Sequence, residues 1–338
     1  MRFVGSVLLL LAFPAGTHCA GAPRPEVAPP PLEREVSFTS RDGTRLAGTL
    51  FLPSSSGPHP AAVFIHGSGP SDRRNAVGDG IARGLASRGI AVLYPDKRGS
   101  GESGGDWKEV GFEPLAEDAA AGAALLRDKA GIEAEAVGVI GFSQGAHIAP
   151  LAARRAGAAF AIALSGSLVS MGEQIFDEVE LMGERAGLGP EEIETINHIH
   201  RLAFHYGRTG EGWDEYAAAR AAASEREWAG REIAAGFPSS RDHFVWSWAP
   251  RILDYDPILH WKRLRIPGLV VWGENDTQVR VGESAAIAAR EIPGFEVTIY
   301  PGAGHGLFRE GTHLVRDDLL DDLAAWICRQ RRSTLRSD

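Results

Sequence analysis

The stretch AVGVIGFSQGAHIAPLAA, residues 136–153, decides the fold of this chain. It begins with an unbroken apolar run, which predicts a buried strand. GFSQG follows at once, at residues 141–145, and the residues after it predict a helix. In this G-x-S-x-G pattern, the tight strand-to-helix turn needs Gly141 and Gly145 because side chains there would collide with the turn. The stretch therefore predicts a nucleophilic Ser143 at the carboxyl edge of a sheet.

The same pattern occurs a second time, as GESGG at residues 101–105, with Ser103 at its centre. This copy follows the loop residues DKRGS rather than a strand, and no helix begins directly after it. Its glycines are typical of a flexible loop. The flanking sequence therefore favours Ser143 over Ser103 as the nucleophile.

Strands and helices alternate on both sides of this stretch. Residues 34–40 and 45–53 alternate in polarity around a turn, which predicts a β-hairpin. Unbroken apolar strands separated by helices indicate a parallel sheet that is covered on both faces. We therefore expect an α/β fold with about eight mostly parallel strands and helices on both faces. The further buried strands are expected at 61–67, 90–96, 160–166, 267–273 and 295–302, and the helices at 78–88, 115–131, 147–157, 282–291 and 314–330.

Residues 166–263 break this alternation, because they contain no strong strand and favour several helices. An insertion of this length between two strands predicts a helical cap over a core formed by residues 35–165 and 264–330. Most of the tryptophans in the cap are expected in its own small core, and some on an apolar pocket that faces the site. Five of the eight tryptophans lie there: Trp213, Trp228, Trp246, Trp248 and Trp261.

The amino-terminal residues are expected to lie outside the fold. Residues 1–22 have a charged start, a short apolar centre and a small-residue end, which is typical of a secretory signal peptide with cleavage near Ala22. A lipoprotein anchored through Cys19 is the alternative, but the residues before Cys19 fit it poorly. Residues 23–34 are rich in proline and predict an extended tether. The sequence thus predicts export to the periplasm or the extracellular space.

The charge balance narrows the choice of partners. The formal net charge is -9, and no run of basic residues offers a surface for nucleic acid. The apolar centre of the signal is too short to span a bilayer, and no other segment could span one. We therefore expect a small-molecule ester or amide as substrate, no nucleic acid and no membrane span.

A serine needs a base and an acid, because a free hydroxyl is a weak nucleophile. His305 and Asp276 lie in loops directly after the last two expected strands, where open α/β sheets place their sites. His305 would take the proton of Ser143, and Asp276 would orient the imidazole. The nearest competing acids are Glu274 and Asp318.

An oxyanion must also be held by preorganised N–H groups. The N–H of Gln144, directly after the nucleophile, is one candidate. The loop HGSGP, residues 66–70, follows an expected strand and supplies the other. We expect the N–H of Ser68 there, with Gly67 as the second choice. His66 is expected to shape this loop rather than to act as a second base.

No cofactor or metal is expected. The stretch NHIHR, residues 197–201, and His205 look like metal ligands, but the cap supplies no cysteines or carboxylates at ligand spacing beside them. GSGESGG is rich in glycine, yet it lacks the lysine of a phosphate-binding loop.

Taken together, HGSGP, DKRGSGES, GFSQG, GEND and GAGH make residues 35–330 resemble the α/β-hydrolase superfamily, in the order that the family uses. The stretch YDPILHWKRLRIPGLVVWGENDTQV is most similar to bacterial capped esterase-like and serine aminopeptidase-like members. The resemblance implies that Ser103 belongs to a family loop and not to the nucleophile turn.

These observations predict a secreted serine hydrolase, most simply a carboxylesterase that acts on short to medium acyl esters through an acyl-enzyme. A serine aminopeptidase or dipeptidyl-peptidase-like enzyme stays open as an alternative. It would need an acidic residue in the cap to bind the substrate amine, and Glu173, Glu178 and Glu180 are available. A thioesterase and a hydrolase-like binding protein without turnover also stay open.

Overall fold

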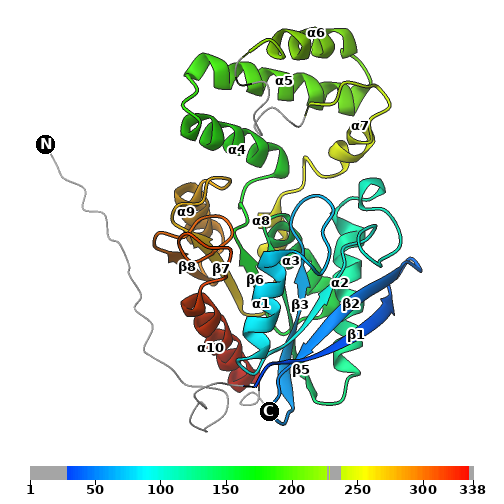
Figure 1. The fold of residues 1–338 in the computed structure, drawn as a ribbon, viewed down its shortest axis with the longest axis vertical. Coiled ribbons are helices and arrows are strands. Elements are labelled where there is room, and N and C mark those ends of the chain that lie inside the picture. Colours follow the sequence, from blue (N-terminus) through cyan, green and yellow to red (C-terminus); the bar gives the residue numbers. More distant parts are fainter. Residues whose placement is uncertain (1–28, 227, 229–236, 335–338) are drawn as a thin grey trace, which may run out of the picture.

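An eight-stranded sheet lies at the centre of the molecule in the computed structural model, which describes residues 29–226, 228 and 237–334 (Figure 1). The strand order is β1-β2-β4-β3-β5-β6-β7-β8, antiparallel from β1 to β4 and parallel from there on. The predicted mostly parallel sheet with an antiparallel hairpin at one edge is therefore confirmed. The strands are β1 (Leu32–Thr39), β2 (Arg45–Leu52), β3 (His59–Ile65), β4 (Ala91–Pro95), β5 (Ile132–Phe142), β6 (Ala161–Leu164), β7 (Gly268–Gly273) and β8 (Glu296–Tyr300).

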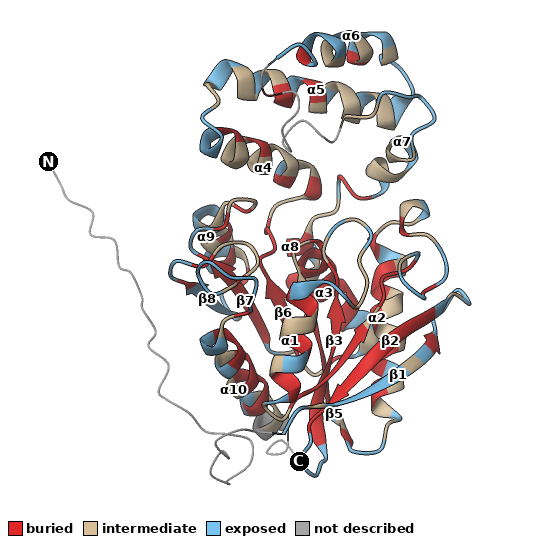
Figure 2. Cartoon of the chain, in the orientation of Figure 1, coloured by how far each residue is buried: buried red, intermediate tan, exposed pale blue. Residues whose placement is uncertain are grey.

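Helices cover both faces of this sheet, as predicted. One face packs against α1 (Ala76–Ala86) and α10 (Asp317–Thr334). The other face packs against α2 (Phe112–Arg127), α3 (Gln144–Ala156), α8 (Pro257–Trp261) and α9 (Val281–Glu291). Figure 2 shows that buried residues fill the central strands and the sheet-facing sides of these helices, while the edge strand β1 is largely exposed.

The central strands are apolar throughout because both of their faces are covered. Along β3, Ala61, Val63 and Ile65 belong to one core cluster. The alternate residues Ala62 and Phe64 belong to the cluster on the opposite face. Side chains of a strand point alternately to the two faces, so a strand between two helix layers has no solvated side.

Helix boundaries differ from the expected ones by a few residues. The helix expected at 78–88 begins at Ala76 instead, because the side chain of Asn75 accepts hydrogen bonds from the N–H groups of Val77 and Gly78. The helix expected at 147–157 begins at Gln144, directly after Ser143. This earlier start puts the helix amino-terminus at the predicted nucleophile.

Among the described residues between β6 and β7, the helices α4 to α7 stand above the core in Figure 1. We call these helices the cap. They have a core of their own, which includes Val179, Ile196, Tyr216 and Trp228. The cap helices are α4 (Met171–Arg185), α5 (Pro190–Thr209), α6 (Trp213–Ala223) and α7 (Val245–Trp248), and a short helix, η3 (Ala249–Arg251), leads out of them.

The last part of the predicted cap range packs against the core. Trp261 of α8 is fully buried there and belongs to the same cluster as α3. It therefore supports the sheet rather than the cap. The limits 166 and 263 for the cap stay a prediction.

The predicted signal peptide, its cleavage site near Ala22 and Cys19 lie outside the described residues. The strand β1 begins at Leu32, so the end of the range 23–34 predicted as a tether is part of the sheet. Across the described residues, no helix combines the length and the apolar character that crossing a membrane requires.

Candidate active site

Ser143 lies in a strained turn between β5 and α3. Its φ is 53° and its ψ is -119°, a conformation that residues other than glycine rarely adopt. A Cβ on Gly141 would lie 2.1 Å from the carbonyl oxygen of Gly145, and a Cβ on Gly145 would lie 2.1 Å from that of Ile65. Neither position can therefore carry a side chain. This is the strand–turn–helix geometry that the sequence predicts.

The turn presents the hydroxyl of Ser143 to the other two predicted site residues. Nε2 of His305 lies 3.0 Å from Oγ of Ser143. Nδ1 of His305 lies 2.9 and 3.0 Å from the two carboxylate oxygens of Asp276. A carboxylate can only accept, so Nδ1 carries the proton and Nε2 is free to accept the proton of Ser143.

Asp276 is held in place by its own loop. Its side chain is fully buried, and Oδ1 accepts hydrogen bonds from the N–H groups of Gln278 and Val279 at 2.8 and 3.1 Å. The loop after β8, which carries His305, is bound to the loop of Asp276, because the N–H of Asn275 donates to the carbonyl of Ala303 at 2.8 Å. The two loops therefore keep the carboxylate against the imidazole of His305.

The competing acids have other partners. Glu274 accepts a hydrogen bond from the N–H of Gly302 at 3.0 Å. Asp318 forms an ion pair with Arg316 at 2.6 Å. Of the three acids weighed in the sequence, Asp276 is the one that the structure places on His305.

The predicted oxyanion loop passes directly beside the nucleophile. A Cβ on Gly67 would lie 3.3 Å from Cβ of Ser143. Among the described residues, the N–H groups of Ser68 and Gln144 donate to no other group. The N–H of Gln144 is one of the first in α3, which have no partner inside the helix. Both donors are therefore available for an oxygen atom of a ligand.

Sequence reasoning missed Lys97, which lies beneath this loop. Its ammonium donates to the carbonyl oxygens of Gly67 and Gly69 at 2.9 and 3.0 Å, and to Oε1 of Gln144 at 3.0 Å. The side chain is buried and lies over the ring of Trp107 in η1 (Trp107–Glu109). A partial signal was present, because a lysine two residues after a buried strand lies at the edge of the sheet where sites form, but that signal did not include the inward direction of its side chain.

His66 has the structural surroundings that we expect for a residue that shapes this loop. Its Nε2 donates to the carbonyl of Pro95 at 2.6 Å, and its Nδ1 accepts from the hydroxyl of Ser71 at 2.9 Å. Burial lowers the pKa of His66 to about 4, so the ring is neutral near pH 7. Both ring nitrogens are engaged by the protein.

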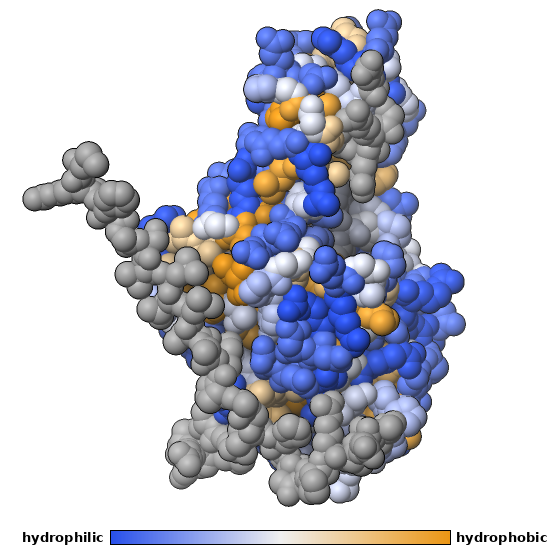
Figure 3. Space-filling model, turned by 60° about the vertical axis from the view of Figure 1, so that its left-hand side comes forward, coloured by the Kyte–Doolittle hydropathy of each residue, from blue (hydrophilic) through white to orange (hydrophobic). Residues whose placement is uncertain are grey.

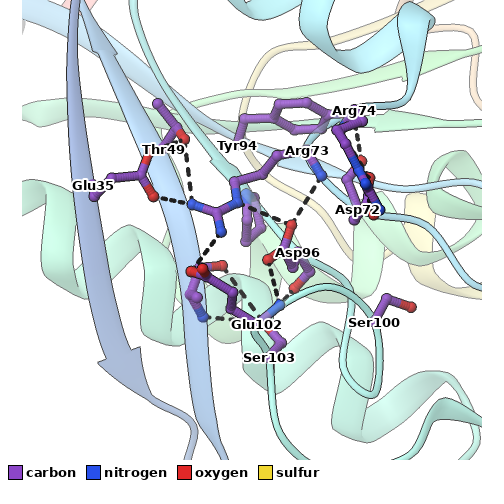
Figure 4. A network of polar contacts seen from close by, with 12 residues as sticks. Glu35, Thr49, Asp72, Arg73, Arg74, Tyr94, Asp96, Ser100, Glu102 and Ser103 are labelled. Atoms are coloured by element: carbon purple, nitrogen blue, oxygen red, sulfur yellow. Dashed lines mark hydrogen bonds and ion pairs between the residues drawn. The ribbon is translucent and has the colours of Figure 1, made fainter.

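Ser103 lies in a different environment. Its hydroxyl donates to the carbonyl of Asp96 at 2.8 Å and accepts from the N–H of Ala47 at 3.0 Å. The surrounding network is drawn in Figure 4, where Arg73 reaches Asp96 and Glu102. The side chain of Ser103 is buried and joins a loop to the sheet. Its contacts are those of a structural residue.

The cap contains a cavity of about 300 Å³ between α4, α5 and α7. Trp248 lines this cavity and packs edge-to-face against Trp107, at 5.4 Å between ring centroids. On the face seen in Figure 3, hydrophobic residues gather along the boundary between cap and core. The polar side chains on the cavity are Glu178 and His200, and much of the rest is apolar, including Ile175, Val179, Met182, Phe204, Trp246 and Trp248.

Metal ligands do not gather anywhere in the part of the chain that the structure describes. No group of three or more His, Cys, Asp or Glu side chains there could hold a metal ion. His200, in the stretch that resembles metal ligands, instead has its Nδ1 3.1 Å from the carbonyl of Ile196.

The fold and the geometry at Ser143 together define a class, the hydrolases built on an open parallel sheet with a nucleophile turn after a central strand. The comparison with known families agrees. Residues 62–318 match the family model described as the alpha/beta hydrolase family, so the chain belongs to that family. The predicted superfamily is thereby confirmed.

Individual relatives are more distant. The chain is 28% identical to the esterase EstD of Thermotoga maritima over 289 residues, which is 83% of this chain and 62% of EstD. It therefore spans less than two thirds of that relative. A thiohydrolase of Aspergillus aculeatus, aneE, is 38% identical over 114 residues, about a third of either chain.

Solved structures that superpose on this chain have low sequence identity to it, so their similarity shows the fold alone. An esterase of Pyrococcus furiosus superposes with a TM-score of 0.54 at 17% identity, over 89% of this chain and 91% of that one. A proline iminopeptidase of Mycobacterium smegmatis gives a TM-score of 0.60 at 18% identity, over 89% and 100% of the two chains.

Proposed function

We propose that the protein is an exported serine hydrolase that cleaves carboxylic esters through an acyl-enzyme. The observation that carries the proposal is the continuous line of hydrogen-bonding atoms from Asp276 through His305 to Ser143. A hydroxyl becomes a useful nucleophile when an oriented base can remove its proton. The strained backbone at Ser143 adds support, since strain of this kind persists where the surrounding structure enforces it.

In this mechanism, Oγ of Ser143 attacks the ester carbonyl carbon while Nε2 of His305 takes its proton. The carbonyl oxygen becomes an oxyanion and accepts hydrogen bonds from the N–H groups of Ser68 and Gln144. Asp276 stabilises the imidazolium that forms. His305 then gives its proton to the leaving alcohol, and afterwards activates the water that releases the acid from Ser143.

An apolar acyl group of short to medium length is the substrate feature that the cap supports. The cap cavity of about 300 Å³ is at the lower end of the usual range for ligand pockets and is lined largely by apolar side chains. The relative EstD is described as an esterase, and aneE as a thiohydrolase. Oxygen esters are therefore the first substrates to test, and thioesters of the same acyl groups the second.

Cleavage of amides at a free amino terminus is the second candidate. It needs a cap carboxylate, and the three acids named in the sequence differ in their surroundings. Glu173 is part of the capping box of α4, and Glu180 forms an ion pair with Arg280. Glu178 lines the cap cavity, so it is the residue that would bind a substrate amine in this alternative.

Export rests on the sequence of residues 1–22. Expression of the full chain in a bacterium should give a mature form that begins near residue 23 in the periplasm or the medium, and the amino terminus can be read by mass spectrometry. A chain recovered from the cytoplasm with residues 1–22 intact would contradict export.

The first experiment is to treat the purified mature protein with a fluorophosphonate and to map the adduct by peptide mass spectrometry. We expect the adduct on Ser143. A panel of acyl esters, acyl thioesters and aminoacyl-naphthylamides then ranks the three hydrolase candidates by kcat/KM. An adduct on Ser103, or no adduct and no turnover on any of the panel, would contradict the proposed function.

A further inference from the structure

The ammonium group of Lys97 is buried behind the predicted oxyanion loop. The residue is 7% exposed. Its three hydrogen-bond acceptors are the carbonyl oxygens of Gly67 and Gly69 and the side-chain oxygen of Gln144. Within the described residues, no carboxylate forms an ion pair with it. A buried charge without a counter-ion is costly, so its presence here needs an explanation.

We propose that Lys97 is a positioning residue that orients both N–H donors of the oxyanion hole, and that the hole is complete only while Lys97 is protonated. The inference rests on the proposed function, since it assigns a task in the same reaction. It goes beyond that function by adding a residue and a pH dependence that the triad does not supply.

The first donor is oriented through a peptide group. The carbonyl of Gly67 and the N–H of Ser68 belong to the same peptide unit, and in a trans peptide these two groups point in opposite directions. Because Lys97 holds the carbonyl oxygen of Gly67, the N–H of Ser68 must point away from Lys97. The hydrogen bond to Gly69 fixes the other end of the same turn.

The second donor is oriented through a side chain. Oε1 of Gln144 accepts from the same ammonium group, and the backbone N–H of Gln144 is the other proposed donor. Lys97 therefore joins the loop after β3 to the first residue of α3. A shift of the Lys97 side chain would move both donors relative to each other.

The proton count links this arrangement to pH. An ammonium group has three N–H donors, and Lys97 uses all three. A neutral amine has two, so one acceptor oxygen would lose its donor and face a lone pair instead. Burial lowers the pKa of Lys97 to about 7, so this loss falls in the range in which the enzyme would work.

The other charges near Lys97 are already engaged. His66, Asp96, Arg98 and Asp118 line a cavity of about 40 Å³ together with Lys97.

Within that cavity, Asp96 accepts from Arg73 at 3.0 Å, and Arg98 pairs with Asp118 at 2.6 Å. His66 is neutral because burial lowers its pKa to about 4. His66 and Arg98 keep their charge states as the pH rises from 6 to 9, so an alkaline change in that range is expected from Lys97.

The expected pH profile follows from the charge of Lys97. The oxyanion hole needs a protonated Lys97, so kcat should fall as the pH rises through about 7 and above. The wild-type profile of kcat should therefore have an alkaline limb that belongs to Lys97.

The test compares Lys97→Met with Lys129→Met, a lysine beyond the end of α2 and outside the proposed site. Lys97→Met should lower kcat about tenfold to a hundredfold, somewhat less than the loss of a whole oxyanion donor, with little change in KM. Its kcat profile should lack the alkaline limb. Lys129→Met should keep both kcat and the limb.

A second variant, Gln144→Met, tests the role of Lys97 even if Lys97→Met does not fold. Gln144→Met keeps the backbone N–H but removes one acceptor of Lys97, so kcat should fall by a smaller factor. Its alkaline limb should weaken, because a neutral amine still has donors for the two acceptors that remain. Thermal unfolding of each variant shows whether it is folded. If Lys97→Met does not fold, the role of Lys97 is tested by the alkaline limb in the wild-type kcat profile and by the fall in kcat of Gln144→Met.

The rate of fluorophosphonate labelling separates this inference from the proposed function. Wild type should be labelled on Ser143, and Lys97→Met should be labelled on the same residue at least several-fold more slowly. Labelling of Lys97→Met at the wild-type rate, or an unchanged kcat with the alkaline limb retained, would overturn the role of Lys97 and leave the proposed function standing. No labelling of the wild type at Ser143 would overturn both.

Discussion

The two copies of the G-x-S-x-G pattern use the same residue types for opposite purposes. At residues 141–145 the serine carries the strained backbone, with a φ of 53°. At residues 101–105 the glycines carry it, with φ values of 54° at Gly101 and 76° at Gly105. The first copy thus forms a turn that presents the side chain of Ser143 to His305, and the second copy bends a loop.

The glycines of the two copies are needed for different reasons. Gly141 and Gly145 are not in the left-handed region, but a Cβ on either would lie 2.1 Å from a backbone oxygen. Gly101 and Gly105 are in that region, which other residues enter only at a cost. A pattern of letters cannot separate these two demands, whereas the strand before Ser143 and the helix after it can.

The second copy nevertheless serves the first. The hydroxyl of Ser103 donates to the carbonyl of Asp96. Lys97 follows Asp96 directly in the sequence, and its ammonium donates to the carbonyl of Gly67 in the predicted oxyanion loop. The carboxylate of Asp96 in turn accepts from the N–H of Arg73, in the segment that follows that loop. The loop that carries the second copy is therefore part of the support of the proposed site around Ser143.

The largest expected difference between the copies is in turnover. Ser143→Ala should reduce kcat on an ester substrate on the order of a million-fold, the scale found for nucleophile removal in comparable triads. The variant should also lose fluorophosphonate labelling while keeping its thermal unfolding temperature. Ester hydrolysis retained in Ser143→Ala would contradict the assignment of the nucleophile.

Replacing Asp276, the acid of the proposed triad, should cause the next largest loss of kcat. Asp276→Asn keeps the shape of the side chain but no longer fixes Nδ1 of His305 as the protonated nitrogen, so kcat should fall about ten-thousand-fold. The matched control is Glu274→Gln, two residues earlier, whose side chain binds the N–H of Gly302. Equal losses in both variants would mean that the loop as a whole, and not the carboxylate on His305, matters.

Local sequence signals carried much of the fold and the candidate site. Apolar runs marked the strands because central strands have no solvated side, and Ser143, Asp276 and His305 each follow such a run closely. These residues are placed by where their strands end. Chain position therefore sufficed to bring them to one edge of the sheet.

The parts that sequence could not supply depend on long-range contacts. The acceptors of Lys97 come from Gly67, Gly69 and Gln144, two segments far from it along the chain. No local pattern tells whether a lysine after a strand points to solvent or inward. The packing of α8 against the core and the cavity inside the cap were hidden for the same reason, since both depend on how helices meet.

The glycines of the two copies offer a test of backbone crowding. Gly145→Ala should cost on the order of 4 kcal/mol or more in the free energy of unfolding, because Ile65 lies in the central strand β3 and its carbonyl cannot move aside. Gly104→Ala in the second copy brings a Cβ only to 3.4 Å from the carbonyl of Arg45, so it should cost about 1 kcal/mol or less. Denaturant unfolding measures both. Similar losses would mean that the turn at Ser143 is not sterically closed.

The smallest expected effect on turnover comes from Ser103→Ala. The change leaves the N–H of Ala47 without its acceptor in a buried place, which should lower the free energy of unfolding by about 1–3 kcal/mol. The hydroxyl of Ser103 does not reach the triad, so kcat should stay within a few-fold of wild type. Denaturant unfolding and ester turnover on the same sample measure the two quantities side by side. A loss of turnover approaching that of Ser143→Ala would show that the two copies share the chemistry, and the contrast drawn from their backbones would then fail.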